Sequence, residues 1–398
     1  MQKSELTKKL NALAAKVITL QQAYIRQLGV NAHIHFELEG CFAIDHHDCP
    51  SFNLTEINQL IRLLNIDGVM VNEYWHNQWE FVSHFHGQSP LREAQNLHKL
   101  MTQLPVLVNQ KYNGNVKTLI KPVVWSGDQG QLAQKCDNIF SNSERVVHIP
   151  NAIQVNVSVS QPLNDNMKIT DKSTVFPQKG ENLVATGCFG EYLQNNFLET
   201  SLGCCLLFLP EEEAFERLTL KTKYGLANEL CSPIDISGGH QGSIALYREK
   251  GKHNQKLGEQ PILYDQYHQI IKSEYNWQAT ARVEHRLGAS SVHYNPFVNV
   301  VFALANVIEA LEKYQAIDAD IVIEKSQSIP ISLPLSLYSS IDNIGAIEQF
   351  QENTWFEKVI NILPSKLSHT IKENMKENKL GDELKQLILA HYQFSLLN

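Results

Sequence analysis

The segment Arg282–Pro296 (RVEHRLGASSVHYNP) places charged side chains at alternate positions just before an apolar helix. On a β-strand successive side chains point to opposite faces, so Arg282, Glu284 and Arg286 would share one face of a sheet. A row of charges is unfavourable against an apolar core and needs water or a charged ligand above it. We therefore expect this strand to line a polar surface that can bind a charged molecule.

Two other segments, Asn31–Phe42 and Ile153–Val159, also alternate polar with apolar residues. The polar side carries His33, His35 and Glu37 in the first segment and Gln154, Asn156 and Ser158 in the second. This period of two predicts two further strands, each with one polar face.

The segment Val69–Val82 (VMVNEYWHNQWEFV) contains two glutamates, Glu73 and Glu80, that lie seven positions apart. A two-residue turn at His76 and Asn77 would make a hairpin in which Glu73 directly opposes Glu80. Two like charges across a ladder are destabilising unless a cation lies between them or water surrounds both. The residues alone leave a cation site and an ordinary exposed hairpin open.

Helices on both sides of the chain would hold these strands in place. Asn295 suits an N-cap and Pro296 the first helical position, and apolar residues then recur with a helical period as far as Tyr314. Leucines and other apolar residues at steps of three and four predict an amphipathic helix from about Ser4 to Leu28.

The bulk composition describes a globular chain. Its 398 residues are 43% hydrophobic, enough for a substantial core. The net charge of −8 argues against nucleic acid or an anionic membrane surface as a partner. The seven cysteines form no CxxC pair, and no apolar run is long enough to span a membrane, so we expect a cytoplasmic protein with reduced thiols.

Three of these motifs resemble the catalytic domain of the glutamine synthetase family. R-V-E-H-R followed by N-P-F is similar to the family's R-I-E-x-R … N-P-Y-L, and Glu73 with the later Q-W-E is similar to its E-x4-A-Q-W-E-F. The segment Pro210–Leu218 (PEEEAFERL) is similar to P-x-x-x-S-Y-K-R-L. The motifs occur in the family's order along the chain.

The resemblance implies an α+β fold with a curved, mainly antiparallel sheet, a half-barrel flanked by helices. Residues 30–398 would form the catalytic domain, and residues 1–29 would be an N-terminal helix. Because only one helix precedes the first of these strands, we expect the family's N-terminal β-grasp domain, which completes the neighbouring subunit's site, to be missing. We therefore expect that any homo-oligomer is not the usual ring with shared sites.

The resemblance also implies two metal positions on the polar strand faces. The residues carried over are His35, Glu73 and Glu80 for one metal and His33, Gln154 and Glu284 for the other. The family uses glutamate at both first-strand positions and histidine where Gln154 stands. Imidazole in place of carboxylate favours Mn or another transition metal over Mg.

By the same resemblance, Arg217 and Arg286 would be the catalytic residues that bind the substrate's charged groups, and Arg282 would lie near ATP. The segment Ser237–Arg248 falls where the family carries two arginines for the nucleotide phosphates. The matching positions here are Gln241 and Leu246, with Arg248 on the same strand face as Leu246.

Three functional hypotheses remain open from the sequence. The first is an ATP-dependent ligase that joins a small-molecule carboxylate to an amine through an acyl phosphate. The second is a catalytically inactive relative that acts as a small-molecule sensor or interaction protein, because the phosphate arginines and the metal histidine are replaced. The third is a metal-dependent amidohydrolase, for which the H-x-H pair at His33 and His35 is the signal.

Overall fold

The computed structural model describes residues 3–44, 52–73, 77–83, 89–125, 148–160, 183–186, 189–223, 244–247, 282–316, 341–367 and 379–396. The strands are β1 (Asn31–Ile44), β2 (Gly68–Asn72), β3 (Gln78–Ser83), β4 (Val116–Leu119), β5 (Val123–Trp125), β6 (His148–Pro150), β7 (Ala152–Ser160), β8 (Ile244–Tyr247) and β9 (Arg282–Ala289). The helices are α1 (Lys3–Gln27), α2 (Leu54–Leu63), α3 (Pro90–Lys111), α5 (Leu183–Thr186), α6 (Phe189–Ser201), α7 (Glu212–Lys223), α10 (Pro296–Gln315), α12 (Asn343–Glu352), α13 (Trp355–Asn361), α14 (Leu363–Lys366) and α16 (Leu380–Leu396), with a 3-10 turn at Cys205–Leu207.

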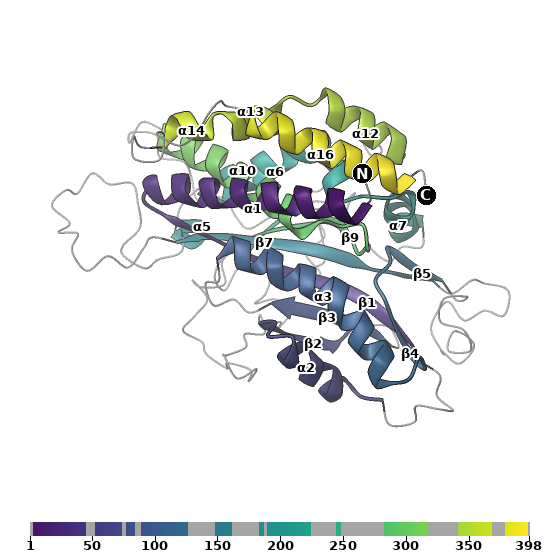
Figure 1. The fold of residues 1–398 in the computed structure, drawn as a ribbon. Coiled ribbons are helices and arrows are strands. Elements are labelled where there is room, and N and C mark those ends of the chain that lie inside the picture. Colours follow the sequence, from purple (N-terminus) through teal and green to yellow (C-terminus); the bar gives the residue numbers. More distant parts are fainter. Residues whose placement is uncertain are drawn as a thin grey trace.

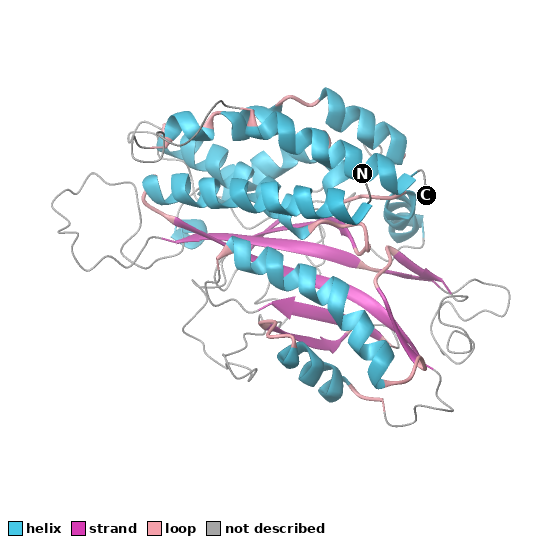
Figure 2. Cartoon of the chain, viewed as in Figure 1, coloured by secondary structure: helices cyan, strands magenta, loops and turns pink. Residues whose placement is uncertain are grey.

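A seven-stranded sheet organises the chain. Its order is β2-β3-β1-β7-β9-β8, with β4 also paired to β1, and its paired neighbours are antiparallel. Strands β5 and β6 form a separate two-stranded sheet. Figure 2 shows this open sheet with helices layered against it. The predicted α+β class with a mainly antiparallel, helix-flanked sheet is confirmed.

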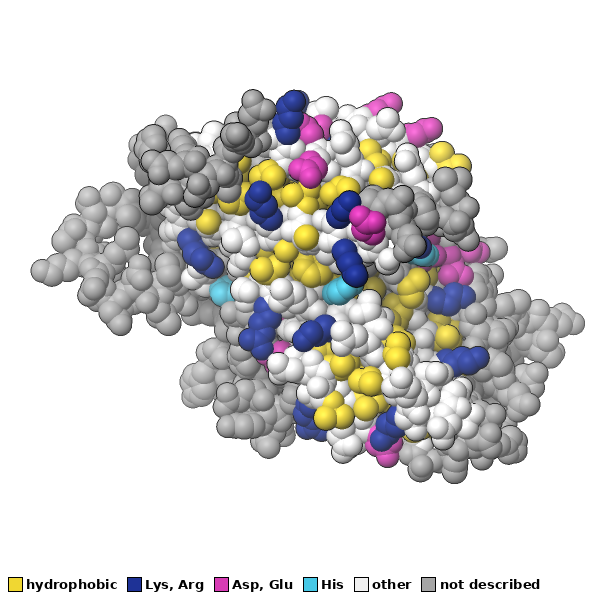
Figure 3. All heavy atoms as spheres, viewed as in Figure 1, with side chains coloured by type: hydrophobic (Ala, Val, Ile, Leu, Met, Phe, Trp, Pro, Cys, Tyr) yellow, Lys and Arg dark blue, Asp and Glu magenta, His cyan; other side chains and the backbone are white. Residues whose placement is uncertain are grey.

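The helices cover the apolar face of the sheet. In β1 the side chains of Ile34, Phe36 and Leu38 are fully buried in the main hydrophobic core. That core also contains the apolar sides of α1, α3 and α10, and α1, α10 and α16 lie together in Figure 1. On the face seen in Figure 3, basic side chains are dispersed among apolar ones over these helices. The polar face of β1 therefore looks away from the helix layer.

Helix α10 lies at the centre of the helix layer. Asn295 caps it by accepting a hydrogen bond from the Val298 backbone N–H at 3.2 Å, and Pro296 takes its first turn, as the sequence predicts. Most of its side chains are buried, which explains its nearly continuous apolar sequence. The buried Gln21 of α1 donates to the Val301 carbonyl at 3.0 Å and joins α1 to α10.

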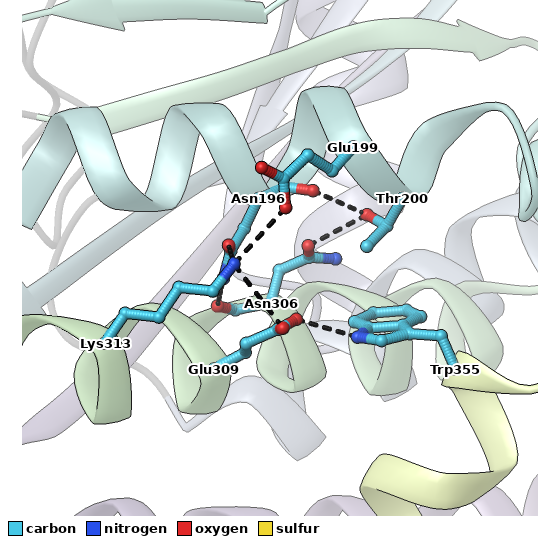
Figure 4. A network of polar contacts seen from close by, with 7 residues as sticks. All are labelled: Asn196, Glu199, Thr200, Asn306, Glu309, Lys313 and Trp355. Atoms are coloured by element: carbon cyan, nitrogen blue, oxygen red, sulfur yellow. Dashed lines mark hydrogen bonds and ion pairs between the residues drawn. The ribbon is translucent and has the colours of Figure 1, made fainter.

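A polar network joins α6, α10 and α13 at the rim of this layer (Figure 4). Its members are Asn196, Glu199, Thr200, Asn306, Glu309, Lys313 and Trp355. The Lys313 ammonium donates to Asn196 Oδ1 at 2.6 Å, and the Trp355 indole N–H donates to Glu309 Oε2 at 2.7 Å. These hydrogen bonds pair the polar side chains of the network with one another where the three helices meet.

The hairpin of β2 and β3 has a different register from the predicted one. Val71, not Glu73, opposes Glu80, and the Glu73 N–H donates to the Gln78 carbonyl at 3.0 Å. Trp79 of β3 opposes Gly40 of β1. A Cβ atom at position 40 would lie 2.3 Å from the Trp79 ring, so the indole packs against β1 in this register because residue 40 is a glycine. A slip of two residues leaves each side chain on its face, so Glu73 and Glu80 still share one face.

Among the helices of the described residues, none is long and apolar enough to cross a membrane.

Glu93 of α3 is an acidic side chain buried under the sheet, at 1% exposure. Burial raises its pKa to about 8, against the opposing effect of the Ser83 hydroxyl. Between pH 4.5 and pH 8 the unfolded chain therefore releases a proton that the folded chain keeps. Below pH 4.5 Glu93 is protonated in both states and costs no stability by ionising. As pH rises through the window, its retained proton lowers the free energy of unfolding by a growing amount.

We expect Glu93→Gln to be more stable than the wild type at pH 8, by about 2–4 kcal/mol, with the gain vanishing near pH 4.5. Urea unfolding at a series of pH values measures this difference. The matched control is Glu348→Gln on the exposed side of α12, which should change stability little at any pH. A Glu93→Gln gain that does not vary with pH would contradict the buried, protonated carboxyl.

Candidate functional site

The polar face of the sheet brings together glutamates from β1, β3 and β9, with Glu73 directly after the end of β2. Glu39 of β1 directly opposes Glu80 of β3. Glu37 of β1 opposes Gln154 of β7, and Asn156 of β7 opposes Glu284 of β9. The long strand β1 thus stands between β3 and β7 and carries carboxylates toward both. We call this surface the acidic face and define it by Glu37, Glu39, Glu73, Glu80 and Glu284.

Glu39 and Glu80 form the part of the acidic face nearest β3. Glu39 Oε2 accepts a hydrogen bond from the Ala152 N–H at 2.7 Å, which fixes its carboxylate beside the start of β7. Burial holds the pKa of Glu80 well above its ordinary range, and the carboxylates of Glu37, Glu39 and Glu73 add to the effect. Like charges facing one another across a ladder favour a proton or another cation between them.

Glu37 and Glu284 form the second part of the acidic face, which also contains Arg282 and Arg286. Asn156 Nδ2 donates to Glu37 Oε1 at 3.0 Å, and the Arg282 Nε–H donates a short hydrogen bond to Asn156 Oδ1. Glu284 lies 3.7 Å from the Arg282 guanidinium and 4.0 Å from that of Arg286. Burial, then repulsion from Glu284, raises the pKa of Glu37 to about 7, and the two arginines oppose this rise.

A bulge between Ile153 and Val155 of β7 adjusts the register against β9 near Arg286. Gly288 of β9 lies at this point, where a Cβ atom would be 2.5 Å from the Ile153 carbonyl oxygen. Only a residue without a side chain allows the two strands to approach so closely.

Asn151, fully buried before β7, ties the acidic face to its surroundings. Its side chain donates to the Lys121 carbonyl at 3.1 Å and accepts from Gln78 Nε2 at 3.1 Å. The backbone carbonyl of Asn151 accepts a hydrogen bond from the Ser290 N–H at 3.2 Å. These contacts fix the ends of β3 and β9 relative to β7, which places Glu80 and Glu284 on one rigid surface.

The other face of β9 is part of the core, as its alternation predicts. The His285 ring packs among Phe197, Phe208 and Phe302, and its Nε2 lies 3.0 Å from Ser201 Oγ. Burial lowers the pKa of His285 to about 3, so the imidazole is neutral at physiological pH. The charges of this strand are therefore confined to the acidic face.

The predicted metal residues are only partly brought together. His33 opposes Ser158, four residues along β7 from Gln154, which is about 13 Å of extended strand. Glu80 opposes Glu39, which is likewise four residues along β1 from His35. The His33 ring bonds Ser160 Oγ at 2.7 Å instead. In the described ranges, no three His, Cys, Asp or Glu side chains stand close enough to hold a metal ion.

Glu37 was placed on the polar row of the first strand but not selected as a site residue, and Glu39 was missed. Glu39 continues the row of His33, His35 and Glu37, so the signal was the same period of two extended by one more residue. Glu37 and Glu39 make the first strand a Glu-x-Glu pair, the residue types that the resembled family carries on this strand.

Arg217 does not belong to this row of strand residues: it lies on α7, which packs against β5 and β6. Its side chain is buried at 1% exposure. Of the residues considered for the nucleotide phosphates, Gln241 and Arg248 lie outside the described residues. Leu246 of β8 points into the main core.

Comparison with solved structures identifies the fold. Over 96% of this chain and 71% of the other, it superposes on a crystal structure of a novel glutamine synthase homolog, with a TM-score of 0.52 and 10% identity. It also matches Plasmodium falciparum glutamine synthetase (TM-score 0.51, 9% identity, 96% and 76% of the two chains). The match to apo GmaS has a TM-score of 0.50 and 12% identity, over 97% of this chain and 74% of that one.

The chain has the glutamine synthetase fold. No protein-family model matches the sequence, and no curated protein does. The resemblance that the sequence motifs indicate is thus supported by the arrangement of the chain in space. At sequence identities of 9–12%, these structures show the fold of the chain and not its activity. The activity has to be inferred from the chemistry of the site.

Asn156 is the side chain on which the geometry of the arginine-containing part depends. We expect Asn156→Ala to destabilise the protein by about 3 kcal/mol, because both a carboxylate and a guanidinium lose a buried partner. Ser158→Ala, on the same face of the same strand, should cost about 1 kcal/mol. Urea unfolding at pH 7 compares the two variants, and equal losses would contradict the bridging role of Asn156.

Proposed function

We propose that the chain is an ATP-dependent carboxylate–amine ligase that forms an amide on glutamate or a related amino acid. The observation that carries this proposal is the acidic face itself: a cluster of glutamates, flanked by Arg282 and Arg286, on a sheet with the glutamine synthetase fold. Such a surface carries carboxylate oxygens that can bind cations and guanidinium N–H groups that can bind anions.

The donor types of the acidic face suit hard divalent cations, because Glu39, Glu73 and Glu80 carry carboxylate oxygens, which Mg and Mn prefer. In the described part of the chain no three such groups stand close enough to hold an ion as they are, so these three carboxylates would have to close around it. This replaces the mixed histidine and carboxylate sets expected from the sequence, because His33 and His35 lie farther along β1. With an ion held there, these carboxylates would place positive charge beside the phosphoryl group that is transferred.

The arginines would bind the acid. Arg217 is buried, and a guanidinium presents a planar fork that matches a carboxylate in two parallel hydrogen bonds. Arg286, at 8% exposure beside Glu284, would hold the second charged group of the substrate. Its orientation by Glu284 means that the guanidinium is positioned before the substrate arrives.

The proposed reaction has two steps. The substrate carboxylate attacks the γ-phosphorus of ATP, which forms an acyl phosphate and releases ADP. The amine then attacks the acyl carbon, the carbon–oxygen bond to phosphate breaks, and phosphate leaves while the nitrogen loses a proton. Fixed positive charge from Arg286 would stabilise the negative charge on the transferred group in the first step.

A second candidate is a catalytically inactive relative that binds a small molecule. It is favoured by the absence, within the described part of the chain, of any three converging metal ligands. The amidohydrolase hypothesis gains no support, since the His33 ring bonds Ser160 and that same part of the chain offers no metal group.

The first experiment is an assay of ADP release from ATP with glutamate and a panel of amines, in Mg and then in Mn. We expect turnover that requires acid, amine and metal together. Glu80→Gln should lower kcat by roughly 10²–10³-fold, the usual effect of removing one electrostatic contact to a transition state. The matched control, Glu93→Gln on the other side of the sheet, should retain activity.

No ADP release with any amine, combined with saturable glutamate binding, would support the inactive relative instead.

Arg217 offers a separate test in binding alone. We expect Arg217→Lys to weaken glutamate binding at least about tenfold, because the charge stays while the planar fork is lost. Arg62→Lys, on the exposed side of α2, is the matched control and should bind as the wild type does. Isothermal titration calorimetry compares the three proteins. Unchanged affinity in Arg217→Lys would mean that this arginine is structural.

A further inference from the structure

The two arginines that would bind the acid lie on different elements. Arg286 is on β9 and Arg217 is on α7, and both are buried, at 8% and 1% exposure. A guanidinium pairs with a carboxylate in a fixed, planar geometry, so two of them bind one small acid only at the correct separation. Contacts between the ends of α7 and β9 therefore bear directly on binding.

The segment before α7 and the segment after β9 lie side by side. The Ala289 N–H, at the end of β9, donates to the Phe208 carbonyl at 3.0 Å. The Ser291 hydroxyl donates a short hydrogen bond to Glu211 Oε1, directly before the first residue of α7. These two contacts join the end of the strand that carries Arg286 to the start of the helix that carries Arg217.

The direction of the Ser291–Glu211 hydrogen bond follows from its surroundings. Ser291 Oγ accepts from the His293 backbone N–H at 3.0 Å, so its single proton remains for the Glu211 carboxylate. Ser291 is fully buried and Glu211 is half-buried, which protects this charge-assisted hydrogen bond from competition by water. Burial lowers the pKa of the His293 imidazole near Glu211, so this ring is mostly uncharged at neutral pH.

The next two residues of the chain hold the same end of α7 by other contacts. Glu212 Oε2 accepts from the Asn343 N–H at 3.1 Å, at the start of α12. Glu213 lies 3.9 Å from the ammonium group of Lys121, which stands between β4 and β5. Neither contact involves β9 or the turn after it, so among these three glutamates the link to that strand comes from Glu211.

We propose that the Ser291–Glu211 hydrogen bond sets the separation of Arg217 and Arg286, so that the two guanidinium groups bind the two carboxylates of a dicarboxylic acid at once. The inference rests on the proposed function, because it assigns what holds the acid-binding arginines in place. Ser291 and Glu211 are positioning residues that act through the arginines.

The test is glutamate binding by isothermal titration calorimetry on the full chain. We expect Ser291→Ala to raise the dissociation constant about tenfold, because α7 can then shift relative to β9 and both guanidinium groups no longer meet the ligand together. Ser290→Ala is the matched control and should bind as the wild type does. Ser290 is the adjacent serine and is equally buried, and its hydroxyl has no hydrogen-bond partner among the described residues.

Glu211 provides the same comparison from the other side of the hydrogen bond. Glu211→Ala removes the acceptor and should weaken glutamate binding about as much as Ser291→Ala does. Glu211→Gln keeps an acceptor oxygen and should bind within about threefold of the wild type. This pair also serves if Ser291→Ala does not fold.

A double variant shows whether Ser291 acts through Arg217. Once Arg217→Lys has weakened binding, adding Ser291→Ala should weaken it by less than about twofold more, because residues that act as a unit are not additive. Losses that multiply in the double variant would overturn the inference, and so would a Ser291→Ala protein that binds glutamate with wild-type affinity.

Hydrogen exchange of the α7 backbone amides without ligand separates this inference from the proposed function. We expect faster exchange in Ser291→Ala than in Ser290→Ala, since the start of the helix has lost its link to β9. If exchange differs in this way and the wild type binds no glutamate, the positioning of α7 stands while the proposed function fails. Equal exchange in the two variants would overturn the inference whether or not glutamate binds.

Discussion

The antiparallel register of β1 against its two neighbours is the constraint on which the site depends. With one face of β1 buried against helices, its other face must carry His33, His35, Glu37 and Glu39 in a row. The register then decides what each one meets: Glu39 faces Glu80, and Glu37 faces Gln154 beside the Arg282 network. Carboxylates from separate strands are thereby forced together, which costs folding free energy unless cations compensate.

The rest of the fold supplies the rigidity that holds these charges. Helix α10 follows β9 after a short turn and is buried along most of its length, so the strand that carries Glu284 is anchored at one end by the core. Asn151 binds the ends of β3 and β9 to β7, and Gly288 allows β7 and β9 to approach at the bulge. The same chain that packs the core thus prepares a surface of fixed charge.

Sequence pattern alone predicted which face each strand residue occupies and could not predict its partner. The alternation in β1, β7 and β9 and the cap at Asn295 are local properties, and the structure shares them. A slip of two or four residues preserves every face, so pattern cannot choose between His33 with His35 and Glu37 with Glu39 as the residues beside Glu80 and Glu284. That choice, like the hairpin register, is made by packing such as Trp79 over Gly40.

Anomalous diffraction from crystals grown with Mn²⁺ and ADP tests the central claim most directly. The account predicts an anomalous peak among the carboxylates of Glu39, Glu73 and Glu80, with Arg282 still in contact with Asn156. A peak at His33 and His35, or a Glu39–Glu80 pair that stays without metal at saturating Mn²⁺, would contradict it.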